Sequence, residues 1–281
     1  MRIHTARLED RGVLRVAGEE AASFLQGLLT NDVESQAVGE ARYAALLSPQ
    51  GKILFDFLAL RVAAESGTAF LIDAPAAQLG DLAKRLGFYR LRAKVTISDE
   101  SAALAVVASW GAPSVPGGLS YADPRDPRLG ARTILPRAEA AALAEGGVEL
   151  YEAHRIRLGV PKGGIDFAYA DIFPHDANLD LLHGVDFEKG CYVGQEVVSR
   201  MRHRGGVRKR ILRLALAGAA PERGTPVLAG DIAVGTLGSA AGANALALVR
   251  LDRIEDARAA GRALTAGGVG VKIEATDLAE A

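Results

Sequence analysis

The sequence is poor in the features that mark secreted, membrane-spanning or nucleic-acid-coating proteins. It holds a single cysteine, Cys191, so no disulfide framework can form within the chain. Its 33 lysines and arginines are matched by 34 acids, and a formal net charge of −1 argues against nucleic-acid binding through bulk charge. The most apolar run, residues 53–64, is interrupted by Asp56 and Arg61 and falls short of the roughly 18 apolar residues of a membrane span. We therefore expect no membrane contact and no direct nucleic-acid binding.

Targeting signals are also lacking. The first residues do not form the apolar core of a secretory signal peptide. The early arginines, Arg2 and Arg7, could suggest a mitochondrial transit peptide, but Glu9 and Asp10 follow closely and such peptides are poor in acids. A lone cysteine fits a reducing compartment. We therefore expect a cytoplasmic location.

Length and apolar patterning predict about two domains of mixed α and β structure. The chain has 281 residues, of which 49% are hydrophobic and 24% are charged, as in ordinary globular proteins. In the first hundred residues, short alternating runs typical of strands are separated by runs typical of helices. Strands are expected at 13–16, 42–47, 53–62, 69–72 and 94–97, and helices at 19–29 and from Asp73 to about Leu86, with Pro75 in the first turn.

The middle of the chain predicts a second α+β unit. Residues 111–130 are rich in Pro, Gly, Asp and Arg, which predicts a long loop and a seam between units near 99–130. Helices are expected at 137–145 and 151–158, the second ended by a glycine with a proline just beyond it. Residues 160–190 are expected to be mostly irregular.

The last seventy residues predict a small β-barrel. Short strands separated by glycine-rich turns follow Arg210, and this spacing is typical of a compact all-β unit. We therefore expect an α+β fold with one region at 1–210, built from two units, and a barrel domain at 211–281. The barrel strands are expected at 211–216, 226–228, 232–237 and 245–249.

Cys191 lies in the most informative stretch, Lys189-Gly190-Cys191-Tyr192-Val193-Gly194-Gln195-Glu196. A small buried residue is one interpretation of a lone cysteine. A reactive thiol is the other, because Lys189 could stabilise a thiolate and a helix expected from Val193 would place the thiol near a helix N-terminus. Gly190 and Gly194 would allow close approach of a ligand. One thiol cannot hold a zinc ion or an iron–sulfur cluster alone, so Cys191 would meet a cluster transiently or as one ligand among several.

A basic stretch follows the cysteine motif. Seven basic residues lie between positions 200 and 213 with no acid among them, and Gly205-Gly206 suggests a turn that brings the flanking arginines together. One interpretation is a solvated charged face. The other is an anion site for the glutamate carboxylates of folate, a phosphate or an RNA backbone. The seven residues are Arg200, Arg202, Arg204, Arg208, Lys209, Arg210 and Arg213.

Asp56 interrupts the apolar strand expected at 53–62. Strand alternation places it on one face with Leu54 and Leu58. Its carboxylate is then either solvated at a sheet edge or buried against a ligand, and the Gly51-Lys52 turn could place it at the mouth of a pocket. The five histidines show no metal-ligand spacing and are expected in loops or at the surface, so no metal site is predicted.

The Lys189–Glu196 stretch resembles the hallmark KGCYxGQE motif of the YgfZ family, folate-binding relatives of the glycine-cleavage T-protein implicated in iron–sulfur cluster assembly and repair. Residues 172–179 and 200–210 resemble the flanking segments of the same family, and segments between 225 and 250 look like the T-protein barrel. The resemblance covers most of the chain. It implies a T-protein-like ring of three units, two folate-binding α+β units and a C-terminal β-barrel, with tetrahydrofolate near the central opening.

The resemblance also implies site residues. Cys191, Lys189 and Asp56 would carry the chemistry, and tetrahydrofolate or a one-carbon derivative would be the cofactor. The expected folate-binding residues are Asp56, Tyr192, Gln195, Glu196, Arg200 and Arg204.

Two positions depart from an ordinary T-protein. Residues 48–56 are similar to the T-protein segment with its catalytic aspartate pair, but here Phe55 takes the first position and Asp56 the second. Arg157 stands in the segment where T-protein has a pterin-binding glutamate, with Glu152 nearby. Both departures weigh against ordinary T-protein chemistry.

We expect a tetrahydrofolate-binding accessory factor for assembly or repair of iron–sulfur clusters, whose partners are folate and iron–sulfur client or assembly proteins. In this interpretation folate occupies the ring while Cys191 receives or relays sulfur, iron or a one-carbon adduct. One alternative is a folate-dependent aminomethyltransferase or other one-carbon transferase, in which Asp56 would orient or deprotonate the amine. Another is a factor that affects tRNA modification through the basic stretch at 200–213.

Overall fold

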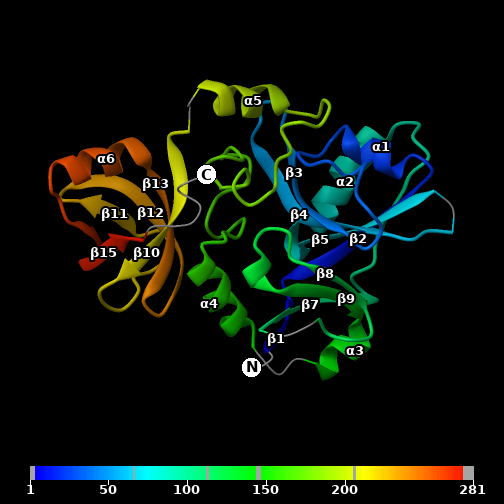
Figure 1. Ribbon diagram of the computed structural model, residues 1–281, viewed down its shortest axis with the longest axis horizontal. Helices are drawn as coiled ribbons and strands as arrows, with labels where there is room; N and C mark the ends of the chain where they lie inside the picture. The colour runs from blue at the N-terminus through cyan, green and yellow to red at the C-terminus, as the bar shows by residue number, and fades with distance from the viewer. Residues whose placement is uncertain (1–3, 66, 112–113, 144–146, 205–206, 275–281) are drawn as a thin grey trace.

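Three structural units surround a long irregular segment, residues 159–194, as Figure 1 shows. The computed structural model describes residues 4–274 except 66, 112–113, 144–146 and 205–206. Two units are sheets with helices and the third is a closed barrel. This confirms the expected T-protein-like combination of two α+β units and a C-terminal barrel.

The first unit is a five-stranded antiparallel sheet with two helices on one face. Its elements are β2 (Arg11–Gly18), α1 (Ala21–Gln26), β3 (Ala41–Leu47), β4 (Ile53–Val62), β5 (Thr68–Pro75), the 3-10 turn η1 (Ala76–Gln78), α2 (Leu79–Arg90) and β6 (Thr96–Asp99). The strand order is β3-β4-β5-β2-β6. Both faces of β4 are buried, because Leu58 packs into the central apolar cluster and Phe57 into the cluster beneath the helices.

Two helix boundaries of this unit differ from the sequence prediction. Asp73 lies in β5 and not at a helix start, and α2 begins only at Leu79. Pairing of β5 with both β2 and β4 overrides the helix-start signal of Asp73 and Pro75. Helix α1 also ends before Leu29, which instead bridges to Leu46 of the sheet.

The second unit is a four-stranded antiparallel sheet that takes its first strand from the beginning of the chain. Its elements are β1 (His4–Arg7), β7 (Leu104–Trp110), β8 (Leu119–Ala122), the 3-10 turn η2 (Pro127–Leu129), β9 (Ala131–Pro136), α3 (Arg137–Ala142) and α4 (Val148–Leu158). The strand order is β1-β7-β9-β8. The prediction of a loop throughout 111–130 is wrong, because Leu119 pairs with Ile134 and β8 forms the sheet edge.

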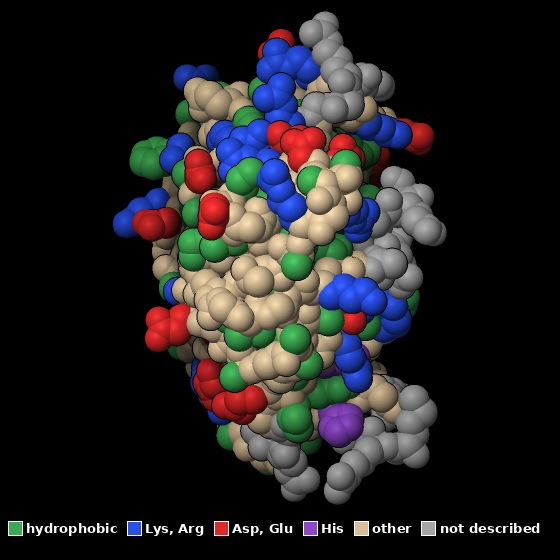
Figure 2. Space-filling view, turned by 90° about the vertical axis from the view of Figure 1, so that its left-hand side faces the viewer, with side chains coloured by type: hydrophobic (Ala, Val, Ile, Leu, Met, Phe, Trp, Pro, Cys, Tyr) green, Lys and Arg blue, Asp and Glu red, His purple; other side chains and the backbone are tan. Residues whose placement is uncertain are grey.

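The third unit is a closed six-stranded barrel in the order β10-β13-β12-β11-β14-β15. Its elements are β10 (Lys209–Leu216), β11 (Pro226–Ala229), β12 (Ile232–Ala241), β13 (Asn244–Arg250), α6 (Leu251–Ala259), β14 (Leu264–Ala266) and β15 (Val269–Ile273). The four expected strands are present, but helix α6 was not predicted; it packs Ile254 and Ala257 onto the barrel core. Figure 2 shows that the barrel end of the molecule carries charges of both signs, mostly toward its margins.

One apolar cluster joins the three units. It contains Tyr43 from the first sheet, Val106 from the second, Leu179 from the irregular segment and Ile211 from the barrel, all buried. The units therefore share a core, and side chains at their junction are removed from water. Among the described residues, no helix is long and apolar enough to cross a membrane.

Candidate functional site

Asp56 is a buried carboxylate held by two tyrosines. It projects from β4 and is only 6% exposed. Its oxygens accept hydrogen bonds from the Tyr43 hydroxyl (2.9 Å) and the Tyr169 hydroxyl (2.5 Å). Burial, and then the charge of Asp56, raises the pKa of both tyrosines well above the ordinary value, so both phenols stay protonated and donate. Of the two interpretations of Asp56 left open by the sequence, solvation at a sheet edge is wrong.

The two tyrosines reach Asp56 by different routes. Tyr43 lies on the neighbouring strand β3, one diagonal position from Asp56 on the same face, as strand pairing dictates. Tyr169 comes from the irregular segment 159–194. Gly163 faces this pair, and a Cβ at that position would lie 2.0 Å from the Tyr169 hydroxyl oxygen. Only glycine fits where Tyr169 meets the carboxylate.

Asp73 is the centre of a second buried group. Its carboxylate accepts from the guanidiniums of Arg11 and Arg132, each at 2.5 Å, and from the Tyr121 hydroxyl at 3.1 Å. Burial acts to raise the pKa of Asp73, but the two guanidiniums outweigh it and hold the pKa below the ordinary value. The residue expected at a helix start is therefore a charged tie between the two sheets.

Asp123 extends this group toward Tyr43. It accepts from Arg125 (2.7 Å) and Arg132 (3.1 Å), and both arginines also donate to the Tyr151 hydroxyl. Burial opposes ionisation of Asp123, yet the arginines keep its pKa well below the ordinary value. The Arg125 guanidinium lies 5.8 Å from the centre of the Tyr43 ring, which brings this group next to the Asp56 site.

Arg155 of α4 connects the centre of the molecule to the barrel. It is 3% exposed and donates to Glu152 (2.5 Å), Asp166 (3.0 Å) and the Ser239 hydroxyl of β12 (2.7 Å). Lys162 adds a second cation on Glu152, at 2.9 Å. The arginine at the T-protein glutamate position, Arg157, is exposed and bonds His154 instead, so Glu152 is the acid that faces the centre.

A small cavity lies among these charged groups. Its volume is about 20 Å³, room for roughly one water molecule. It is lined by Leu8, Asp10, Arg11, Arg125, Arg132, Tyr151, Glu152, Arg155 and Lys162.

The Cys191 thiol is exposed on the loop that precedes helix α5 (Gln195–Arg204). The loop is ordered by its own residues: the Tyr192 backbone N–H donates to the Gln195 side chain (2.9 Å). Gly194 has a positive φ of 82°, and a Cβ there would lie 2.5 Å from the Ser48 carbonyl oxygen. The loop therefore rests on the β3–β4 turn at a point where only glycine fits, and the interpretation of Cys191 as a buried residue is wrong.

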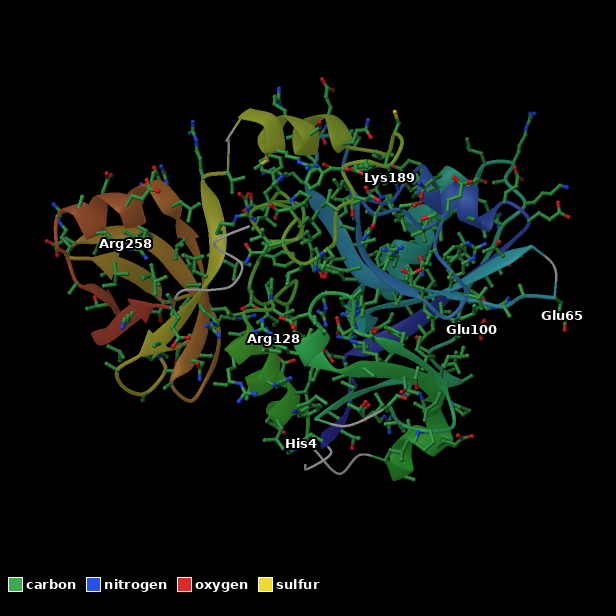
Figure 3. The ribbon with its side chains drawn as sticks, viewed as in Figure 1. His4, Glu65, Glu100, Arg128, Lys189 and Arg258 are labelled. Atoms are coloured by element: carbon green, nitrogen blue, oxygen red, sulfur yellow. The ribbon has the colours of Figure 1, made fainter. Side chains whose placement is uncertain are left out.

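Lys189 anchors the same loop and lies beside the first unit, inside the outline of the molecule (Figure 3). Its ammonium donates to the backbone carbonyls of Gln26, Leu29 and Asn31 at 2.7–2.8 Å. Burial lowers the pKa of Lys189 to about 8. The sequence did not predict this structural contact, and a role of Lys189 beside the thiol stays a prediction.

The expected site residues fall into two groups. The cysteine loop touches the β3–β4 turn at Gly51, and Asp56 follows five residues later, on the order of 16 Å along an extended strand. Near the loop, a cavity of about 100 Å³ is lined by Asp186, Phe187, Lys189, Tyr192, Gln195 and Ser199. Tyr192 and Gln195 thus share one pocket with Lys189, while Glu196 and Arg200 are exposed on α5.

The basic stretch does not form one uniform face. Arg210 is paired with Asp180 (2.6 Å) and Arg213 with Glu274 (3.3 Å). Arg202 is exposed and stacks over the Phe187 ring at 4.1 Å. The side chain of Arg204, and the turn expected at 205–206, lie outside the described residues.

His175 lies in a loop, as was expected of the histidines, but it is not at the surface. It is on the irregular segment but only 2% exposed, packed 5.9 Å from the Phe187 ring. Neither ring nitrogen has a hydrogen-bond partner within the described part of the chain, and burial lowers the pKa of His175. Its neighbours in sequence, Pro174 and Asp176, are also buried. Within the described ranges, no three His, Cys, Asp or Glu side chains gather as a metal site would require.

Two family models match the chain, one at each end. The GCVT N-terminal domain matches residues 8–115, and the CAF17 C-terminal beta-barrel domain matches residues 208–280. Among solved structures, glycine cleavage system aminomethyltransferase T from Bartonella henselae aligns with a TM-score of 0.77 over 98% of this chain and 86% of that one. The identity is 18%, so this likeness shows the fold alone.

Curated relatives match most of the chain. The mitochondrial iron–sulfur cluster assembly factor IBA57 of Homo sapiens is 34% identical over 278 residues, covering 89% of this chain and 78% of the relative. The IBA57 homolog of Mycosarcoma maydis is 39% identical over 237 residues, but the match spans only 58% of that relative. The mouse protein is 33% identical, with 78% of its length covered.

The relatives correct the expected location. All three are named as mitochondrial proteins, which contradicts a cytoplasmic assignment. That assignment depended on the lack of an apolar signal core and of a spanning segment, neither of which distinguishes the cytoplasm from the interior of a mitochondrion. It also depended on the acids at positions 9 and 10, which weighed against a transit peptide.

Proposed function

The chain belongs to the CAF17/IBA57 family of iron–sulfur cluster assembly factors, and from that premise we propose that it helps to assemble or repair clusters in client enzymes, with Cys191 as its point of contact. The relatives carry the IBA57 name, so the YgfZ resemblance holds only as a relationship between T-protein-like assembly proteins. The observation that supports the proposal most directly is the exposed thiol on a loop fixed to the first sheet.

The loop geometry suits a thiol that meets a partner. Lys189 ties one side of the loop to the end of α1, and Gly194 seats the other side on the β3–β4 turn. A thiol held in a fixed direction loses less conformational freedom when it binds. Because one thiolate cannot hold a cluster alone, the client or assembly partner supplies the remaining ligands.

We further propose that a reduced folate binds near Asp56. The T-protein-like fold supports this, and Asp56 with its two phenols offers a buried acceptor of the kind that recognises N–H donors. A bound one-carbon derivative would supply the one-carbon unit that it carries on N5 or N10, and bound tetrahydrofolate would accept such a unit. Both oxygens of Asp56 already accept phenol hydrogen bonds, so the residues fit such a ligand only if one phenol, the half-buried Tyr169, moves.

Other assigned residues remain part of the proposal. Tyr192, Gln195 and Glu196 lie on or beside the cysteine loop, and Arg200 is exposed on α5, where it could meet the anionic tail of folate or an acidic partner. An aminomethyltransferase activity has less support, because both oxygens of the single acid, Asp56, already accept protein hydrogen bonds. None of the contacts among the described residues supports a role in tRNA modification.

Replacement of Cys191 tests the assembly role. In cells that lack this protein, wild type should restore the activity of an iron–sulfur enzyme, and Cys191→Ala should leave it near the level of the deficient cells. The matched control is Glu188→Gln, an exposed change on the same loop, which should restore activity fully. Immunoblots and thermal unfolding establish that all variants are made and folded. Full rescue by Cys191→Ala would refute the role of the thiol.

A further inference from the structure

The two phenols on Asp56 differ in how firmly they are held. Tyr43 sits in a sheet strand and is 1% exposed. Tyr169 is only half-buried, and its neighbours Ala168, Ala170 and Asp171 are exposed. Its hydroxyl ends on Asp56 and its ring meets Phe167 edge-on, with ring centres 5.6 Å apart. One partner of the carboxylate, Tyr43, is therefore part of the core. The other, Tyr169, lies on a segment at the surface, residues 167–171, which we call the strap.

The strap contains backbone strain beside Tyr169. Ala170 has a φ of 63°, in the left-handed region that a residue with a Cβ seldom adopts. Its N–H donates to the Ile53 carbonyl (2.7 Å), and the next tie to β4 is Ile53 N–H to the Ile172 carbonyl (3.0 Å). Strain of this kind persists where the surroundings enforce it and is concentrated at ligand clamps and switches. Release of the Tyr169 hydroxyl would remove one of the contacts that enforce it.

We propose that the Tyr169 side chain takes the place of a ligand on Asp56, and that the ligand binds by turning Tyr169 outward. The inference rests on the folate-binding part of the proposed function and names the residue that controls it. The ligand is a planar heterocycle that offers N–H donors to a carboxylate, as the aminopyrimidinone edge of a pterin does. Each oxygen of Asp56 keeps a second lone pair for such an edge, but Tyr169 covers the carboxylate from the surface side, whereas Tyr43 approaches it from the core.

The exchange has a consequence for affinity. The ligand must compete with a phenol hydrogen bond to a charged acceptor, so only a fraction of molecules is open at any moment and the apparent Kd is raised by that fraction. Tyr169→Phe keeps the ring and removes the bond. We expect it to bind a reduced folate on the order of tenfold more tightly than wild type.

The test is anaerobic calorimetric titration with 5-formyltetrahydrofolate of wild type, Tyr169→Phe, Tyr43→Phe and Asp56→Asn. Tyr43→Phe is the matched control, because it removes the other phenol hydroxyl from Asp56 but lies in the core and blocks no entry. We expect tighter binding only for Tyr169→Phe, no gain for Tyr43→Phe and loss for Asp56→Asn. Pterin-6-carboxylate should reproduce the gain and p-aminobenzoylglutamate should not, because only the first carries the donor edge.

Hydrogen exchange provides a second readout that does not depend on the variants. When the folate binds to wild type, the backbone amides of residues 167–171 should exchange hydrogen faster, because the strap is released. A bound ligand ordinarily slows exchange, so the expected change has the opposite sign. Equal or weaker binding by Tyr169→Phe, an equal gain for Tyr43→Phe, or added protection of 167–171 would each overturn the proposal. Absence of binding in every variant would overturn it together with the folate part of the function. The assembly role is decided separately by the Cys191 rescue experiment, which needs no folate binding.

Discussion

Most buried polar side chains in the described part of the chain have hydrogen-bond partners, and His175 is the most informative of the exceptions. Asp56, Asp73 and Asp166 each accept hydrogen bonds from two or more partners, as burial of a carboxylate requires. His175 is just as buried, yet neither of its ring nitrogens is bonded among the described residues. A neutral imidazole tolerates this environment, but an imidazolium does not, because no acceptor replaces the lost water.

We expect His175 to make the protein sensitive to mild acid. Burial lowers the pKa of His175 below its usual 6.5, so below about pH 6.5 the unfolded chain binds a proton that the folded chain does not. The free energy of unfolding therefore falls as pH drops from 6.5 toward 5. The carboxylates with lowered pKa values, such as Asp73, change the free energy of unfolding in a separate pH range, below about pH 4.

His175→Leu should make this slope shallower, as measured by urea unfolding between pH 5 and pH 7.5. Some slope should remain, because burial also lowers the pKa of His154. His183→Asn is the matched control. His183 is exposed with a φ of 57°, a conformation that asparagine accepts, so the slope should remain in that variant. An unchanged slope in His175→Leu would assign the acid sensitivity to other groups.

At the scale of elements, local patterns predict strands well and contacts poorly. Strands β3 and β4 were predicted closely because alternation and a turn sequence are local signals. The true start of α2 was missed because pairing of β5 with the distant strand β2 decides it. Strand β8 was missed because it is short and lies in a segment rich in Pro, Gly, Asp and Arg, although its partner β9 is the next strand of the chain. No pattern could predict the bond between Tyr169 and Asp56, which are 113 positions apart in an irregular segment and a strand.

The cysteine loop offers a direct test at this scale. Gly194→Ala places a Cβ 2.5 Å from the Ser48 carbonyl at a positive φ, so we expect a loss of about 1–3 kcal/mol of stability and a displaced loop. Gly190→Ala, in the same loop, meets no atom within 4 Å and should change stability by less than about 0.5 kcal/mol. Urea unfolding and the rate of Cys191 modification by a disulfide reagent measure both effects. Equal behaviour of the two variants would mean that the loop is not fixed at Gly194.

At the scale of the whole molecule, buried charges fasten units that apolar contacts alone would leave less specific. Asp73 ties the two sheets together through Arg132 of β9, and Arg155 ties α4 to the barrel through Ser239. The patterning along the chain predicted two α+β units and a terminal barrel, and the family resemblance implied that they form a ring of three units. These ties were not foreseen, because the charged residues are far apart in sequence and resemble ordinary surface charges.

Arg155→Met tests the link between the barrel and the rest. The change leaves Asp166 and Glu152 without their shared cation in a nearly dry site, which should cost about 3–5 kcal/mol of stability. Asp166 also accepts from the Ser239 backbone N–H (2.6 Å), and a Cβ at Gly238 would lie 2.4 Å from Asp166, so the barrel surface is fitted to this carboxylate.

Loss of the Arg155 contacts should therefore weaken the docking of the barrel onto the rest of the molecule more than it lowers the stability of the barrel domain itself. Calorimetry should show one cooperative transition in wild type and two in Arg155→Met, the second from a barrel whose own core, around Leu214 and Val249, is unchanged. Arg157→Met is the matched control, because Arg157 lies two residues away on the same helix but is exposed, and it should keep the single transition. A single transition shifted down by the full amount in Arg155→Met would instead mean that the apolar cluster shared by the three units is sufficient to keep the barrel coupled.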